Sequence, residues 1–187
     1  YDLYRENPED PRSEFYHYAT FSGALRIKKQ DVVLELGSSY REKYPEGDYY
    51  SDVTAGMVAT MEETADFAPM LAMLKDFLDK RPMDAFSAKF LASWAARLFE
   101  EGRLQEIVEQ CATWQEMHEN PVFEDGLYYW PGMAHLQLAG YKEAIDRFTG
   151  LIGGFPLSAY TPDGTLRKGI CHYYEQETGP ARETLTA

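Results

Sequence analysis

Apolar residues recur along this chain at the spacing of helices, and short turn segments separate the runs. Between residues 141 and 152 they stand at i, i+1, i+4, i+7 and i+8, which is one stripe along a helix. They are Ala144, Ile145, Phe148, Leu151 and Ile152. Gly153 and Gly154 follow, and glycine accepts the left-handed conformation of a helix cap. Pro156 cannot continue a helix. The pattern predicts a helix from about Tyr141 to Ile152.

A period of 37 residues repeats this unit along the chain. Pro45, Pro82 and Pro156 each follow an amphipathic run, at intervals of 37 and twice 37 residues. At this period the repeats start near residues 14, 51, 88, 125 and 162, after a lead-in segment at 1–13 that contains Pro8 and Pro11. Small or apolar residues fill three columns: Phe21, Val58, Ala95, Gly132 and Gly169 at place 8; Val33, Met70, Ile107, Ala144 and Ala181 at place 20; Gly37, Leu74, Cys111, Phe148 and Leu185 at place 24. The closing column holds proline in three repeats and Glu119 in the fourth.

Each repeat is expected to be a hairpin of two helices. The fourth would have helices at about 127–138 and 141–152, with a turn at Ala139–Gly140, and the third would turn at Gly102. We expect Gly132 to face Ala144, and Gly169 to face Ala181, so that the backbones approach. A lone hairpin cannot bury its apolar face, so neighbours must stack. Because no stretch alternates with period two, we expect an all-α solenoid of four full hairpins and a truncated fifth, forming one domain over 14–187.

These residues resemble the tetratricopeptide repeat (TPR) family. The stretch "YYWPGMAHLQLAGYKEAIDRF" followed by "FP" is similar to the family pattern through Tyr128, Gly132, His135, Tyr141, Ala144, Phe148 and Pro156. The fifth repeat matches through Gly169, His172, Ala181 and Leu185. Repeats one to three depart from the pattern, since Phe21 and Val58 replace the small residue at place 8. We expect those hairpins to splay more widely. The resemblance also implies that the fold is a right-handed α-solenoid.

The connectors add the extra length over the usual 34-residue unit of the family. "FPLSAYTPDG" resembles connectors of bacterial envelope repeat proteins, including the lipoprotein of the outer-membrane barrel assembly machinery and the coordinator of the Tol-Pal system. This resemblance implies a periplasmic or envelope location, with the cytoplasm as the alternative. No apolar run approaches the roughly 18 residues of a membrane span. The chain opens at Tyr1 without Met, so we allow for a leader that was removed.

The TPR resemblance implies a concave groove lined by places two, five, nine and twelve of each first helix. With Trp130 from the aromatic cluster beside Pro131, the candidate binding residues are Phe15, Tyr18, Lys89, Phe99, Tyr129, Trp130, Met133, Leu136, Ile170 and Tyr173. The lysines and asparagines of the family's carboxylate clamp are missing from places five and nine. An aromatic groove suits an apolar peptide or helix. The alternative is that these residues pack on one another or on a missing N-terminal helix.

Two prolines test the helical assignment. Pro69 falls in the first turn of its helix, where the missing N–H costs little. Pro131 falls deeper in the first helix of the fourth repeat and removes the bond to the carbonyl of Leu127. We therefore predict a kink or a late helix start beside the aromatic residues Tyr128, Tyr129 and Trp130.

Charge and residue chemistry narrow the function classes. The formal net charge of −13 over 187 residues argues against nucleic acid and anionic lipid as partners, and it gives a weak hint of a basic partner. His135 and His172 stand one period apart, at about 10 Å between neighbouring helices, too far to share a metal. Cys111 and Cys171 are expected as buried thiols. Glu62, Glu63 and Asp66 are expected to face solvent, with Asp66 as a helix N-cap.

No catalytic motif appears, so we expect no enzyme activity, metal or cofactor. The leading hypothesis is a non-catalytic scaffold that binds a protein or peptide in its groove. Two alternatives stay open: a regulatory or substrate-delivery module of a larger enzyme, and a module that self-associates through its C-terminal end. Because no polar capping helix precedes Ala187, we expect a piece of a larger protein, or an end that packs on a partner.

Overall fold

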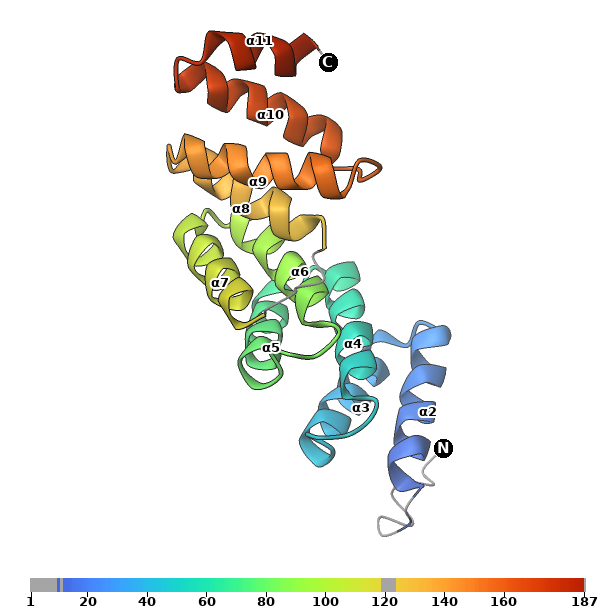
Figure 1. Ribbon diagram of the computed structural model, residues 1–187. Helices are drawn as coiled ribbons and strands as arrows, with labels where there is room; N and C mark the ends of the chain where they lie inside the picture. Colours follow the sequence, from blue (N-terminus) through green and yellow to red (C-terminus); the bar gives the residue numbers. More distant parts are fainter. Residues whose placement is uncertain (1–9, 11, 119–123, 187) are drawn as a thin grey trace. The chain divides into compact units, whose positions relative to one another are not determined.

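The computed structural model describes residue 10, residues 12–118 and residues 124–186, and within these it contains ten helices and no strand (Figure 1). The helices are α2 (Ser13–Arg26), α3 (Gln30–Lys43), α4 (Tyr50–Thr64), α5 (Phe67–Lys80), α6 (Ser87–Glu100), α7 (Leu104–Met117), α8 (Gly126–Gln137), α9 (Tyr141–Gly154), α10 (Thr161–Tyr174) and α11 (Thr178–Thr186). The predicted all-helical fold is confirmed. Pro8, Pro11 and Glu119 lie outside the described residues.

The 37-residue period is visible in the starts of the first helices. These helices begin at Ser13, Tyr50, Ser87, Gly126 and Thr161, all within about two residues of one 37-residue spacing. The last hairpin is shorter than the others, because α11 has 9 residues whereas α10 has 14. Both observations agree with the predicted series of four full hairpins and a truncated fifth.

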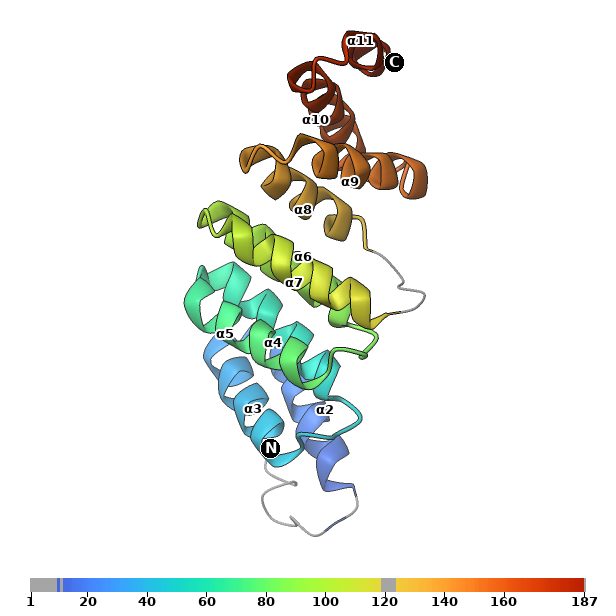
Figure 2. The ribbon, with the colours of Figure 1, turned by 60° about the vertical axis from the view of Figure 1, so that its left-hand side comes forward.

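The chain divides into two compact units, residues 1–73 and residues 74–187, and the division falls within α5. In the first unit α3 packs against α2 and α4, around a core that includes Phe21, Val33, Tyr40, Val53 and Met57. In the second unit α8 packs against α6, α7, α9 and α10, and α10 also packs against α11 (Figure 2). Leu98, Ile107, Phe148 and Leu151 are fully buried there. A single domain over 14–187 stays a prediction.

A residue in the left-handed conformation ends the first helix of every hairpin. It stands at place 15 of each repeat, with φ between 54° and 74°, and the five residues are Lys28, Ala65, Gly102, Ala139 and Gln176. The N–H of the next residue then donates back across the turn, as from Gly140 to the carbonyl of His135 at 2.8 Å. Only Gly102 takes this conformation without the steric cost of a Cβ atom.

Glycine lets the two helices of a hairpin approach, but its partner differs from the predicted one. A Cβ atom built on Gly132 would lie 2.9 Å from Cε1 of Phe148, and one on Gly169 would lie 2.6 Å from Cδ2 of Leu185. These partners stand at place 24, four residues beyond Ala144 and Ala181. The closest contact at each glycine is therefore with the side chain one turn further along than the predicted alanine.

The first hairpin uses the same contact with the residue sizes exchanged. Phe21 holds place 8 and Gly37 holds place 24. A Cβ atom on Gly37 would lie 3.2 Å from Cε2 of Phe21, and it would also meet Sδ of Met57 on α4 at 2.5 Å. Phe21 is only 1% exposed. Gly37 on the opposite helix thus leaves room for the Phe21 ring, while the wider splay expected for this hairpin stays a prediction.

The structure tests the predictions made for Pro69 and Pro131. Pro69 lies in the first turn of α5, as predicted, and Asp66 directly precedes that helix. α8 begins at Gly126 and continues through the buried Pro131. The predicted late start is therefore wrong, and the alternative, a kink at Pro131, stays a prediction. Asp125 supports the observed start, because its side chain accepts a hydrogen bond from the N–H of Gly126 at 2.7 Å.

The close contact at Gly132 makes a testable prediction. Gly132→Ala should lower the free energy of unfolding by about 1–3 kcal/mol, because the added methyl group overpacks against the buried Phe148 ring. Gly153→Ala is the matched control, since a Cβ atom there meets nothing within 4 Å, and it should leave stability unchanged or raise it by up to about 1 kcal/mol. Urea denaturation followed by circular dichroism measures both. A Gly132→Ala protein as stable as the control would contradict the close approach.

Candidate functional site

The ten candidate binding residues range from buried to exposed. Phe15 and Tyr18 belong to the first unit, and the other eight belong to the second. Tyr129 and Met133 are buried, at 9% and 8% exposed. Phe15, Lys89 and Tyr173 are exposed, and Tyr18, Phe99, Trp130, Leu136 and Ile170 are half-buried. Tyr129 and Met133 therefore serve first as core, while the role of the set in binding stays a prediction.

An aromatic cluster surrounds Tyr129 in the second unit. Its ring stacks on the ring of Tyr160, with centroids 4.5 Å apart and an interplanar angle of 14°. Trp130 meets both rings edge-on, at centroid distances of 4.9 Å to Tyr129 and 5.8 Å to Tyr160. Phe99 of α6 extends the cluster, 5.5 Å from Trp130. The cluster thus joins two neighbouring first helices and the connector before the third.

A carboxylate completes this cluster. The hydroxyl of Tyr129 donates to Oδ2 of Asp163 at 2.7 Å, and Arg167 pairs with the same carboxylate at 3.2 Å. Burial, followed by this acceptor, raises the pKa of Tyr129. We call Tyr129, Tyr160 and Asp163 the second tyrosine–aspartate cluster.

The first unit contains a related arrangement, a pair of stacked tyrosines beside an aspartate. Tyr18 stacks on Tyr49, with centroids 4.1 Å apart and an interplanar angle of 7°. Phe15 lies 6.3 Å from Tyr49. Burial raises the pKa of Tyr18, and the negative charge of Asp52 adds to the rise. We call Tyr18, Tyr49 and Asp52 the first tyrosine–aspartate cluster.

The two clusters are related by the repeat. Each of their three positions recurs after 111 residues, which is three periods of 37. Sequence reasoning identified Tyr18 and Tyr129 but missed their stacking partners Tyr49 and Tyr160. The signal was present as a fifth column, because place 36 is aromatic in four repeats. Its residues are Tyr49, Phe86, Phe123 and Tyr160, of which Phe123 lies outside the described residues.

Two histidines and both cysteines are explained by their contacts and burial within the fold. His172 contacts the carboxylate of Glu177 at 2.6 Å, and burial, followed by the charge of Arg147, lowers the pKa of His135. Cys111 and Cys171 are free and buried, as expected, and burial raises the pKa of Cys111 to about 12. Among the described residues, no group of three His, Cys, Asp or Glu side chains is placed to hold a metal ion.

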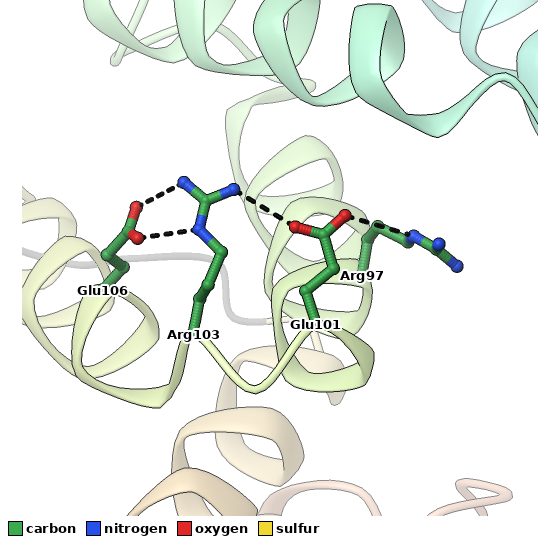
Figure 3. Close-up of polar contacts among 4 residues, drawn as sticks. All are labelled: Arg97, Glu101, Arg103 and Glu106. Atoms are coloured by element: carbon green, nitrogen blue, oxygen red, sulfur yellow. Dashed lines mark hydrogen bonds and ion pairs between the residues drawn. The ribbon is translucent and has the colours of Figure 1, made fainter.

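A charged cluster at the α6–α7 turn is paired within itself (Figure 3). Arg103 contacts Glu106 at 2.7 Å and Glu101 at 3.2 Å, and Glu101 lies 3.8 Å from Arg97. Hydrogen bonds from Arg103 hold the pKa of Glu106 below its usual value. Because Glu106 stands in the first turn of α7, its charge also suits the positive end of the helix dipole. The cluster therefore supports the turn, and it offers no acid–base pair for catalysis.

Comparison with known proteins assigns the fold. No family model and no curated protein matches the chain. Solved structures do match. YrrB, described as "a TPR protein with an unusual peptide-binding site", is similar at a TM-score of 0.69 and 12% identity, covering 99% of this chain and 90% of YrrB. A tetratricopeptide repeat protein from Parabacteroides merdae gives 0.69 and 12%, covering 94% of this chain and 65% of that protein.

Pseudomonas aeruginosa PilF gives a TM-score of 0.63 and 16% identity, covering 91% of this chain and 72% of PilF. These identities establish the fold alone, and they confirm the expected TPR-like class. The likeness of the connectors to envelope proteins stays a prediction. None of the described helices combines the length and the apolar character that crossing a bilayer requires.

Tyr129→Phe tests the hydrogen bond to Asp163. At about pH 8 the variant should lose about 1 kcal/mol of unfolding free energy. The raised pKa of Tyr129 means that the unfolded chain ionises this phenol from about pH 10 upward while the folded protein keeps it protonated. The stabilising contribution is therefore complete below about pH 10 and falls as pH rises.

Urea denaturation between about pH 8 and pH 12 should show a shallower loss of stability for Tyr129→Phe than for the unmodified protein. Tyr173→Phe is the control, because that side chain is 67% exposed, and it should follow the unmodified protein. Parallel curves for Tyr129→Phe and the unmodified protein would show that the hydrogen bond to Asp163 does not act in solution.

Proposed function

We propose that this protein is a non-catalytic scaffold that binds a protein or peptide through the first helices of its second unit. The surface consists of Phe99 on α6, Trp130 and Leu136 on α8, and Leu166, Ile170 and Tyr173 on α10. One observation carries the proposal: apolar side chains remain partly or largely exposed on all three helices. We call these six residues the first-helix surface.

Helix geometry brings these side chains together. Leu166, Ile170 and Tyr173 stand at i, i+4 and i+7, and so form one stripe along α10. α8 packs against both α6 and α10, and Phe99 contacts Trp130 across the first of these junctions. An extended segment or a helix laid across the three helices would therefore meet apolar surface on each of them.

The exposed area is large enough to matter for binding. Tyr173 is 67% exposed and Leu166 is 48% exposed. Fully burying one such side chain contributes about 1.5–3 kcal/mol before the cost of association. Phe99, Trp130 and Leu136 of this surface pack against the buried cluster that contains Tyr129, Met133 and Phe148. This packing restrains the three side chains and so limits the entropy lost on binding.

The comparisons support the recognition of a protein partner through the fold alone. The description of YrrB names a peptide-binding site, and we extend peptide binding to this chain as part of the proposal. A bacterial envelope location belongs to the proposal too, on the strength of the connector "FPLSAYTPDG". A regulatory or substrate-delivery role within a larger enzyme is the alternative that uses the same surface.

Self-association is a second candidate, and exposed side chains near the C-terminal end favour it. Tyr174 is 56% exposed and Leu185 is 50% exposed. Light scattering over a hundredfold concentration range decides this case. A mass that rises with concentration would support self-association, and a constant monomer mass would reject it.

Peptides selected from a random display library against the full chain test the peptide-binding proposal. Tyr173→Ala and Leu166→Ala should each weaken the selected peptides by roughly tenfold, because they remove exposed contact area without opening the core. Leu157→Ala is the matched control, since Leu157 is 98% exposed and lies in the α9–α10 connector. Tyr129→Ala is unsuitable, because it would destroy the second tyrosine–aspartate cluster. Unchanged affinity in both test variants would place binding elsewhere.

A further inference from the structure

We infer that the first tyrosine–aspartate cluster, Tyr18, Tyr49 and Asp52, receives an arginine side chain of the protein partner. This inference rests on the proposed scaffold function and names the chemistry of the partner at a second surface. The cluster presents two half-buried stacked tyrosines, the exposed ring of Phe15 and an exposed carboxylate. Aromatic faces attract cations, and a carboxylate fixes the guanidinium by paired hydrogen bonds.

In the second cluster an arginine of the chain itself pairs with the aspartate. There, Arg167 pairs with Asp163 at 3.2 Å, beside the stacked Tyr129 and Tyr160. Three periods earlier the position of Arg167 is occupied by Gly56. The chain therefore supplies its own arginine to one cluster and none from the same position to the other.

Packing explains why the first unit cannot supply this arginine. A Cβ atom built on Gly56 would lie 2.7 Å from Cζ of Phe21 and 3.1 Å from Cδ2 of Leu25. Phe21 stands at place 8 of its repeat, where the counterpart in the second unit is Gly132, which has no side chain. A side chain at position 56 is thus excluded by the core of the first hairpin, and the cation has to come from outside.

The surrounding charges leave Asp52 open to a partner. No basic side chain among the described residues forms an ion pair with Asp52. Arg12 pairs with Asp10 and lies over the ring of Tyr16, and Lys43 lies over the ring of Tyr44. Arg41 lies over Tyr50. Asp48, in the connector that carries Tyr49, is exposed, and the formal net charge of −13 adds to the attraction for a basic segment.

Arginine fits the cluster better than lysine. Its planar guanidinium stacks on aromatic rings and donates two parallel hydrogen bonds to one carboxylate, whereas lysine carries a compact, strongly hydrated charge. We therefore expect the cluster to prefer arginine over lysine, and both over a neutral side chain of the same length.

An NMR titration of the full chain with labelled tyrosine and phenylalanine rings tests the inference. The probe is N-acetyl-arginine amide, and its uncharged analogue N-acetyl-citrulline amide is the control. Arginine should produce saturating shifts of the Tyr18 and Tyr49 rings, with a Kd on the order of 10–100 mM for a single residue. Citrulline should bind at least about fivefold more weakly, as should arginine to Asp52→Asn.

Arg167→Ala extends the test to the second cluster. In the unmodified protein Tyr160 should not respond to the probe, because Arg167 already occupies the carboxylate. In Arg167→Ala it should begin to respond, with an affinity similar to that of the first cluster. Circular dichroism checks that each variant is folded, and Asp31→Asn, on the exposed side of α3, controls for the loss of one charge.

Two results would overturn the inference: equal shifts with arginine and citrulline at Tyr18 and Tyr49, or a Tyr160 ring that stays silent in Arg167→Ala. The outcome is independent of the peptide selection above, which reports on Tyr173 and Leu166. Selected peptides whose affinity is unchanged by Tyr173→Ala and Leu166→Ala would rule out binding at the first-helix surface. The titration would still decide whether the first tyrosine–aspartate cluster receives arginine.

Discussion

Each of the best-defined hairpins in this protein is closed by a small residue on one helix against a large side chain on the other. In the fourth and fifth hairpins the first helix contributes glycine and the second contributes Phe148 or Leu185. In the first hairpin the order is exchanged, with Phe21 opposite Gly37. The pair must meet where the two helices cross, so it fixes the register of one helix against the other. The left-handed residue at place 15 turns the chain back at the same position in every repeat.

This register has a direct consequence for the surface. The outward positions of the first helices recur with the period, so the same tyrosine, connector tyrosine and aspartate are assembled once in each unit. The exchange of Phe21 and Gly37 then makes the two tyrosine–aspartate clusters differ in whether an arginine stands beside the aspartate. Phe21 requires Gly56 beside it, whereas its counterpart Gly132 is matched by Arg167 three periods after Gly56. A choice made in the core thus decides whether the carboxylate nearby carries an internal cation.

The same relation between core and surface holds at the first-helix surface. Tyr129 and Met133 were expected to line a groove, yet they belong to the buried cluster with Phe148 and Leu151. Leu136, further along the same helix, and Tyr173 on α10 keep part of their area in solvent. A fold of stacked hairpins therefore presents apolar side chains without sacrificing its core, which suits the recognition of a protein chain better than the binding of a small molecule.

The sequence by itself determined the helices, their 37-residue period and the turns at Gly102 and Ala139. Hydrophobic periodicity and turn residues are local signals, and they recur in each repeat. It did not determine that Gly132 meets Phe148, that α8 continues through Pro131, or that Tyr18 and Tyr129 stack on connector tyrosines. Those facts depend on where two helices cross and on which side chain fills the space between them. Only the tertiary structure decides such contacts, since they join residues many positions apart through packing and not through any local pattern.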